Sequence, residues 1–264
     1  MKKTYYAILA LLICVFLLTA CGGNSPYDEY ARAYEMLRQE SSFATSGHDV
    51  TYTFVTATGE ETTAEATMDC QVVKTEAGSD GIGSTAVKGE TNQGSADEYT
   101  ADIYIRDGRE YYVIHDPDLP EDTRGSTACY PDLAFKMATE GVFDLPQEVI
   151  ASQSAEDTDA GRLLTFTLDP EKFYFYLYGK PDSQTLLYGF REPPVYTALL
   201  DEEGRLKRVT YSSCLASADA EPSLWQRDVQ VDFLHYGDIE LDFPELNEED
   251  YPDYTPQADQ APSE

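Results

Sequence analysis

The stretch His48–Val55, with the sequence HDVTYTFV, decides the fold class of this chain. Apolar or aromatic side chains occupy every second position from Val50 to Phe54 and threonines stand between them, which is the two-residue period of a β-strand. After the turn signal Thr58-Gly59, strand-forming residues continue through Thr62–Thr75 (TTAEATMDCQVVKT). We therefore expect neighbouring β-strands in this part of the chain.

The same alternation recurs towards the C-terminus, without the strand–helix–strand order of a parallel sheet. Turn signals such as Asp107-Gly108 separate the runs, so we expect consecutive antiparallel hairpins that form one large curved sheet. Two stretches rich in turn-forming residues, Ala77–Ser95 and Asp116–Thr127, are predicted to be loops, the first with the alternative of a frayed hairpin end. The further predicted strands are Tyr99–Ile105, Glu110–His115, Glu148–Ser154, Leu164–Leu168, Leu186–Phe190, Val195–Leu200, Arg205–Ser213, Trp225–His235 and Asp238–Phe243.

Three segments have helical patterns. In Pro26–Ser41, apolar side chains at i, i+3, i+4 and i+7 predict an amphipathic helix capped by Ser25. Pro131–Gly141 is weakly helical, and Asp169-Pro170 opens a short helix, EKFYFYLYG, that Gly179 ends. The predicted fold class is mainly β (α+β): a large curved antiparallel sheet, or half-barrel, covered by the N-terminal helix and the short inserted helices.

The N-terminus has the form of an export signal. Lys2-Lys3 precedes the apolar run Ala7–Leu18, which is shorter than the ~20 residues of a membrane-spanning helix. The following Leu18–Cys21 (LTAC) resembles a bacterial lipobox, and this resemblance implies cleavage between Ala20 and Cys21 and lipid on the Cys21 thiol. The alternative that we weighed is an uncleaved N-terminal anchor. We expect a protein held by lipid on the extracytoplasmic face of the cell membrane, its expected partner.

These patterns divide the chain into four parts. We expect a lipoprotein signal peptide at 1–20, a lipidated leash at 21–26 and one half-barrel domain at 27–244. From residue 245 to residue 264 the chain is acidic and Pro-rich without an apolar period, which predicts a disordered tail.

The charge of the chain excludes several classes of function. There are 18 Lys and Arg against 49 Asp and Glu, for a net charge of −31. Nucleic-acid binding needs clustered cations, so we expect none, and the same charge opposes adhesion to anionic lipid headgroups. No H-E-x-x-H, G-x-S-x-G or P-loop pattern occurs, and the histidines are isolated. We therefore expect no enzyme activity, no catalytic residue and no cofactor.

Metal and disulfide chemistry are weakly indicated. Asp157–Asp159 and Glu248–Asp250 could hold Ca²⁺ weakly but lack EF-hand spacing, so we interpret them as a solvated turn and part of the tail and predict no metal site. Cys70, Cys129 and Cys214 remain after the signal peptide and the lipid site. Three cysteines cannot all pair; either one disulfide forms or all stay reduced, and we favour structural thiols.

The order of elements resembles that of the LolA/LppX-like lipoproteins over about Tyr27 to Pro244. The resemblance rests on Leu164–Leu168 followed by Asp169-Pro170 and a helix, on the hairpin Leu199–Tyr211, and on the closing Val231–Pro244, each of which is a generic pattern. It implies a helix followed by an antiparallel half-barrel, with short helices over its open face. Members of that group bind lipids or other hydrophobic molecules between sheet and helices. No ligand residue is matched by a motif.

The 20 Tyr and 11 Phe leave two interpretations of the space between sheet and helices. We favour plain core packing over a ligand cavity, because pockets are few per protein. In the ligand hypothesis the protein is a carrier or sensor of a hydrophobic molecule, and Pro131–Phe143 or Phe173–Tyr178 gates access. The alternative is a ligand-free scaffold whose acidic surface contacts unknown envelope partners. The candidate ligand-lining residues are Val50, Tyr52, Phe54, Ile103, Ile105, Phe166, Leu168, Phe173, Tyr176, Leu177, Val231 and Phe233.

Overall fold

The computed structural model describes residues 25–92, 94, 96–179, 188–218, 222–247 and 249–253 of the protein. The predicted signal peptide, the lipobox with Ala20 and Cys21, and residues 254–264 of the predicted tail lie outside this part. The described helices are α2 (Pro26–Gln39), α3 (Leu133–Ala138) and α4 (Pro170–Tyr178), with a 3-10 turn at Gln147–Val149. The strands are β1 (Ser42–Val55), β2 (Glu60–Thr75), β3 (Gly78–Thr91), β4 (Ala96–Arg106), β5 (Arg109–His115), β6 (Thr123–Ala128), β7 (Ile150–Thr158), β8 (Gly161–Leu168), β9 (Tyr188–Phe190), β10 (Val195–Leu200), β11 (Leu206–Ser217) and β12 (Leu224–Tyr236).

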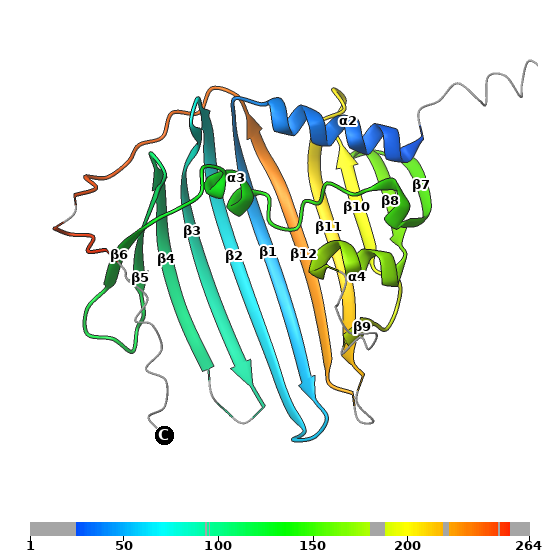
Figure 1. Ribbon diagram of the computed structural model, residues 1–264, viewed down its shortest axis with the longest axis horizontal. Coiled ribbons are helices and arrows are strands. Elements are labelled where there is room, and N and C mark those ends of the chain that lie inside the picture. The colour runs from blue at the N-terminus through cyan, green and yellow to red at the C-terminus, as the bar shows by residue number, and fades with distance from the viewer. Residues whose placement is uncertain are drawn as a thin grey trace, which may run out of the picture.

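All twelve strands belong to one curved, unclosed sheet (Figure 1). Its order is β6-β5-β4-β3-β2-β1-β12-β11-β10-β8-β7, with β9 paired to β11, and every ladder between these strands is antiparallel. The first and last strands therefore meet at the centre through the β1–β12 ladder. The first half of the chain extends the sheet to one side and the second half extends it to the other, which confirms the predicted half-barrel.

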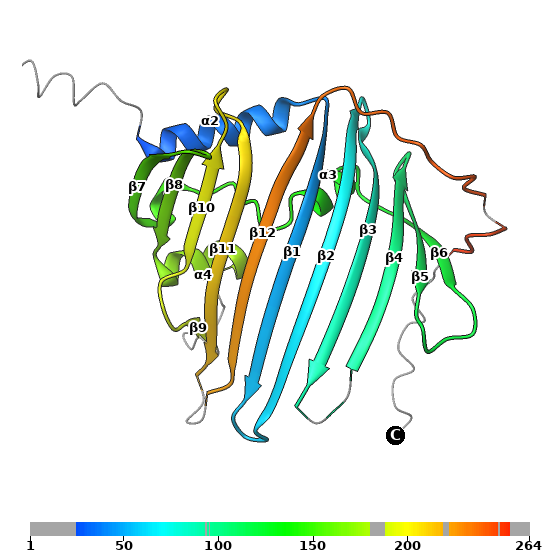
Figure 2. The same ribbon diagram turned by 180° about the vertical axis from the view of Figure 1, so that it is seen from behind.

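The helices lie on the concave face (Figure 1), while the view from behind shows the strands unobstructed (Figure 2). In α2 the Ser25 side chain accepts a hydrogen bond from the Asp28 backbone N–H, and the Asp28 side chain accepts one from the Ser25 N–H. This capping box satisfies N–H groups that the first helical turn leaves without partners. Tyr30, Ala33 and Leu37 form the buried face of α2, as the sequence predicts.

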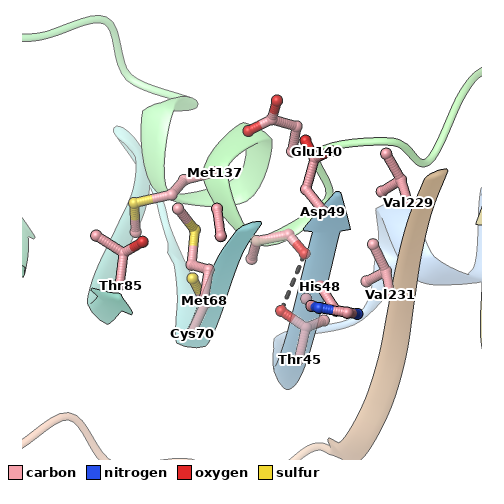
Figure 3. Close-up of a pocket in the computed structure, with 13 residues that line it drawn as sticks. Thr45, His48, Asp49, Met68, Cys70, Thr85, Met137, Glu140, Val229 and Val231 are labelled. Carbon is pink, nitrogen blue, oxygen red and sulfur yellow. Dashed lines mark hydrogen bonds between the residues drawn. The ribbon is translucent and has the colours of Figure 1, made fainter. Parts of the chain in front are cut away.

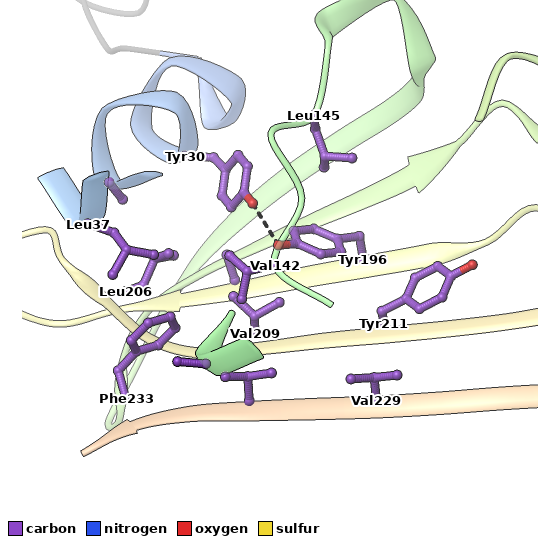
Figure 4. Close-up of a cluster of buried hydrophobic side chains, with 14 of the residues drawn as sticks. Tyr30, Leu37, Val142, Leu145, Tyr196, Leu206, Val209, Tyr211, Val229 and Phe233 are labelled. Atoms are coloured by element: carbon purple, nitrogen blue, oxygen red, sulfur yellow. Dashed lines mark hydrogen bonds between the residues drawn. The ribbon is translucent and has the colours of Figure 1, made fainter. Parts of the chain in front are cut away.

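Large side chains fill the space between the sheet and α2 (Figure 4), and Phe173 of α4 is buried in the same core. Tyr30 of α2 and Tyr196 of β10 are fully buried and their hydroxyl oxygens are 2.6 Å apart. The Tyr30 hydroxyl also donates to the Phe143 carbonyl oxygen at 2.5 Å. Phe166 packs edge-on against Tyr30, with ring centroids 5.6 Å apart. This part of the half-barrel is a solid core held by a buried network of phenol hydrogen bonds.

The prediction of a loop at Ala77–Ser95 is wrong, because most of it forms the 14-residue strand β3. Its glycines serve close packing. A Cβ added at Gly81 would lie 2.8 Å from the Ala134 Cβ, and one added at Gly83 would lie 2.9 Å from the Met137 Cε. Glycine in a strand often marks the close approach of other atoms. Here it lets α3 rest directly on the sheet.

Three other boundaries differ from expectation. Thr123–Ala128, placed partly in a loop, pairs with β5 as β6. The predicted strand Asp238–Phe243 is not a strand: it has no ladder partner and follows β12 as irregular chain. Residues 249–253 of the predicted disordered tail lie against β5 and β6: Tyr251 is buried, and its ring packs edge-on against Tyr111 at 5.6 Å. The Tyr251 ring, hydrogen bonds from Ser126 to the carbonyl oxygens of Tyr251 and Pro252, and the ion pair between Arg109 and Asp253 hold this acidic segment.

Candidate functional site

The strand register determines which side chains face the helices. At the start of β1 the Phe43 ring packs edge-on against Phe135 of α3, with centroids 5.7 Å apart. The Thr45 hydroxyl donates to the Ala138 carbonyl oxygen at 2.9 Å. Odd-numbered residues of β1 therefore face the concave side, because side chains alternate between the faces of a strand. Through the ladders this face continues across even-numbered residues of β2 and odd-numbered residues of β3, β4 and β12.

Three of the predicted ligand-lining residues lie on the wrong face. Val50, Tyr52 and Phe54 of β1 point to the convex side, opposite the helices, where Val50 pairs with Asp228 and Glu65. The sequence pattern identified the apolar side of His48–Val55 but not the true start of the strand at Ser42. Phe43 and Thr45 set the register, so Thr51 and Thr53 face the hollow and Tyr52 and Phe54 face outward.

The other predicted lining residues lie on or near the concave side. The fully buried ones, Phe166, Leu168 and Phe173, belong to the solid core, whereas Tyr176 is 37% exposed and donates a hydrogen bond to the Asp144 carbonyl oxygen at 3.0 Å. Ile103, Ile105, Val231 and Phe233 face α3 or the adjoining core, and Leu177 packs against the same core.

A small cavity lies beneath α3, over β1, β2, β3 and β12 (Figure 3). Its volume is about 80 Å³. That is room for two or three water molecules, at about 30 Å³ each in the liquid, and not for an acyl chain. Its walls are mostly apolar and include three sulfur-bearing side chains. The side chains named in Figure 3 are Thr45, His48, Asp49, Met68, Cys70, Thr85, Met137, Glu140, Val229 and Val231.

A charged cluster borders this cavity. Arg227 of β12 donates to the Asp49 Oδ2 atom from Nε at 2.9 Å and from Nη2 at 2.5 Å, and its Nη2 also donates to Glu140 at 2.8 Å. Burial lowers the pKa of Arg227, but the hydrogen bonds to both carboxylates outweigh it and raise the pKa above its ordinary value. The Asp49 Oδ1 atom is buried without a protein partner. The cluster brings charged side chains to the concave face at the border of the cavity.

Below the cavity and the helices the concave face is bare. Eight half-buried positions, which we call the open floor, form a patch of small or short side chains across β1, β2 and β3. Aromatic side chains stand on both sides: Tyr99 of β4 is 37% exposed, and Tyr188 of β9 is 43% exposed and packs edge-on against Trp225 at 5.4 Å. The open floor consists of Thr51, Thr53, Thr62, Ala64, Ala66, Val87, Gly89 and Thr91.

Sequence reasoning found only part of this surface. In Thr62–Thr75 the two-residue period of a strand places Ala64, Ala66, Met68 and Cys70 on one face, and the register confirms this. The sequence does not predict the β3 contribution, because Val87 and Gly89 fall in a stretch predicted as loop. One signal in the sequence marks the open floor: small residues occupy every second position in two consecutive strands.

The convex face of the same strands is acidic. Carboxylates at alternate positions of β2, β3, β4 and β12 face away from the helices, and few cations stand among them. His48 lies on this face, 2.8 Å from Glu65. The carboxylates are Glu61, Glu65, Asp69, Glu90, Glu98, Asp102, Asp228 and Asp232.

Cys70, Cys129 and Cys214 are free thiols, with no disulfide among the described residues. The favoured interpretation, a buried structural cysteine at all three positions, holds for Cys70 alone, because Cys129 and Cys214 are only partly buried. In the same part of the chain, no group of three or more His, Cys, Asp or Glu side chains could hold a metal ion. No described helix is both long enough and apolar enough to cross a membrane.

Comparison with known proteins gives no family. No family model and no curated protein matches the chain. Similar solved structures include a DUF1329 family protein from Desulfovibrio piger ATCC 29098, at 11% identity over 79% of this chain and 91% of the other, with a TM-score of 0.27. A β-barrel-like DUF1849 protein from Brucella abortus is 11% identical over 74% and 99%, with a TM-score of 0.21. The β domain of the Bordetella autotransporter Brka is 10% identical over 74% and 99%, with a TM-score of 0.30. At these TM-scores the likenesses carry no argument.

Proposed function

We propose that this protein is a lipid-anchored extracytoplasmic protein whose open floor binds a hydrophobic molecule. The anchoring part of the proposal rests on the signal-like N-terminus, the lipobox resemblance and Cys21. The binding part rests on the open floor, and it refines the resemblance to the LolA/LppX-like lipoproteins. The ligand lies along the sheet below the helices rather than in a closed pocket beneath them.

One observation carries the binding proposal: the two faces of the same strands differ in chemistry. The open floor is uncharged and its side chains are small, whereas the convex face of these strands is lined by carboxylates. The open floor lies between aromatic residues and is bordered on the same face by the charged side chains of Asp97, Asp49 and Arg227. Its uncharged centre suits an extended apolar molecule, because burying it removes apolar area from water on both partners. The acidic convex face would keep the protein soluble and away from anionic lipid headgroups.

The binding test uses a matched pair of variants. Native mass spectrometry of the detergent-purified full chain, followed by solvent extraction, should detect a co-purifying lipid or other apolar molecule. Ala66→Trp fills the open floor, and Thr67→Trp places the same side chain on the exposed convex face one residue away. We expect the adduct to disappear in A66W and to persist in T67W. An adduct that is equally abundant in both variants would contradict the assignment to this face.

A ligand-free scaffold is the second candidate, and the filled core favours it. The space under α2 and α4 is packed, and the cavity under α3 holds only about 80 Å³. Absence of any apolar adduct from the wild-type chain would support the scaffold.

Anchoring is tested separately: radiolabelled palmitate should label the wild-type chain and leave Cys21→Ala unlabelled, and labelling of C21A would refute lipidation at that residue.

A further inference from the structure

We propose that Met68, Cys70 and Met137 form a binding site for a soft monovalent metal ion, Cu(I), in the cavity beneath α3. The site adjoins the open floor at Ala66, which lines the same cavity, but its ligands are not part of the floor and the proposal does not depend on hydrophobic ligand binding. It adds a metal-binding activity to a chain whose nitrogen and oxygen ligands form no such site in the described part.

Two of the three sulfur ligands come from one strand. Met68 and Cys70 are two residues apart in β2, so both side chains point to the concave face. Met137 comes from α3, which packs across β2 and β3 and places its side chain over the same spot. All three sulfur-bearing side chains line the cavity, as Figure 3 shows.

Gly83 brings the third ligand close to the second. It pairs with Cys70 in the β2–β3 ladder and has no side chain to fill the space above the thiol. A Cβ at this position would lie 2.9 Å from the Met137 Cε and 3.3 Å from the Cys70 Sγ. The tip of the thioether and the thiol therefore border one small space, which any larger residue at position 83 would occupy.

The ligand set determines the ion. One thiol and two thioethers are soft donors that select Cu(I), whereas carboxylates and carbonyls suit hard cations. Among the nearby carboxylates, Glu140 and the Oδ2 atom of Asp49 are engaged by Arg227, and the remaining Asp49 Oδ1 atom alone does not make an oxygen site. Val229, Val231 and Ala138 supply apolar walls. A Cu(I) ion bound to a thiolate and two thioethers has no net charge, so a low-dielectric cavity accommodates it.

The ion can reach the three sulfur atoms from solvent, and the proton of the Cys70 thiol is accounted for when it binds. Cys70 is only 3% exposed, but Met68 and Met137 are partly exposed and give a path from solvent. Burial raises the pKa of the Cys70 thiol to about 12, so the ion meets a protonated thiol. Binding forms a Cu–S bond and releases one proton to solvent, with no change in the oxidation state of copper or sulfur.

Packing alone is the competing explanation, because Met and Cys also fill irregular gaps in cores. The distribution of sulfur in the chain argues against a chance cluster. There are four methionines and five cysteines in 264 residues, and two of the methionines meet one of the cysteines in a cavity of about 80 Å³. Met36 of α2 and Cys214 of β11 lie elsewhere and provide matched controls.

The test is an anaerobic titration of the full chain with Cu(I) against a chromogenic Cu(I) chelator. We expect one tightly bound ion per chain. Met68→Leu with Met137→Leu, a nearly volume-conserving pair of changes, should weaken binding at least tenfold, and Cys70→Ser should do the same. Met36→Leu and Cys214→Ser should bind as the wild type does. Copper X-ray absorption of the loaded protein should show sulfur as the only near neighbour.

Circular dichroism of each variant establishes that it is folded, and the leucine pair keeps the test decisive if C70S does not fold. Wild-type protein that fails to compete with the chelator overturns the proposal. So does binding that persists in the folded leucine double variant, or a first shell of nitrogen and oxygen in the absorption spectrum.

Discussion

The two halves of the concave face are built from the same kind of antiparallel strands, but helices cover one half and leave part of the other open. Across β8, β10 and β11, one row of the ladder presents Phe166, Tyr196 and Tyr211, and helices α2 and α4 cover it. Two rows further down, across β2 and β3, the inward positions are Ala64 and Gly89, and the described helices do not cover them. Under α2 and α4, large inward side chains bury apolar area against the helices, whereas α3 rests on the glycines Gly81 and Gly83 of β3. Beyond α3 the small inward side chains have no described helix over them, which separates the covered part of the concave face from the candidate binding part.

The largest expected effect is in the covered half. Phe166 is fully buried and contacts the rings of Tyr30 and Tyr196. Phe166→Ala should lower the free energy of unfolding by about 3–5 kcal/mol, because it leaves a cavity in a packed core. Val87→Ala on the open floor should cost about 1 kcal/mol or less. Urea denaturation followed by circular dichroism measures both; equal losses would remove the distinction between the halves.

A smaller difference in stability is expected when each of two glycines of β3 is replaced by alanine. A Cβ at Gly81 would meet the Ala134 Cβ at 2.8 Å and the Gln71 carbonyl oxygen at 3.0 Å, whereas a Cβ at Gly89 would lie 3.9 Å from its nearest neighbour, the Asp97 carbonyl oxygen. Gly81→Ala should therefore destabilise the fold by about 1–3 kcal/mol through overpacking against α3. Gly89→Ala should be neutral or slightly stabilising, since it restricts the unfolded chain. Thermal and urea unfolding of the two variants side by side decide whether α3 rests on the glycines.

The sequence predicted the architecture well where the pattern was strong. The period of Pro26–Ser41 predicted α2 with its cap and buried face, and Asp169-Pro170 with Gly179 predicted α4. It failed at β3, because glycines that serve the close approach of α3 look the same as glycines of a loop. It also placed Val50, Tyr52 and Phe54 on the inner face, since alternation identifies two faces but tertiary contacts decide which one turns inward.

The candidate sites depend on contacts that no local pattern contains. Met137 is distant in sequence from Met68 and Cys70, and only the packing of α3 on β2 and β3 brings them together. The ion pair of Arg227 with Asp49 joins strands at opposite ends of the chain in the same way.

Alkaline pH should destabilise the covered half. Burial raises the pKa of Tyr30 and Tyr196 above the ordinary value and raises that of Tyr211 to about 12. Their stabilising contribution is complete below the unfolded-state pKa of about 10 and is lost as the pH rises through the folded-state values. We expect the free energy of unfolding to fall by about 1 kcal/mol per buried phenol between pH 10 and pH 11. Urea titrations at both pH values should show a shallower fall in Tyr211→Phe.

The smallest effect concerns thiol reactivity and leaves stability unchanged. Cys70 is 3% exposed, whereas Cys129 and Cys214 are partly exposed. A disulfide reagent added to the native protein should modify Cys129 and Cys214 first and Cys70 last, because reaction requires access and a thiolate. Peptide mapping by mass spectrometry gives the order, and early modification of Cys70 would show that α3 does not cover it.

The central claim is that the open floor binds a hydrophobic molecule, and in-cell photocrosslinking tests it most directly. A benzoylphenylalanine introduced in place of Ala64 points to the concave face, and one in place of Glu65 points to the convex face of the same strand. After irradiation, mass spectrometry should find an apolar small-molecule adduct at position 64 and none at position 65. Adducts at position 65 alone, or at both positions in equal amount, would contradict a ligand-binding concave face.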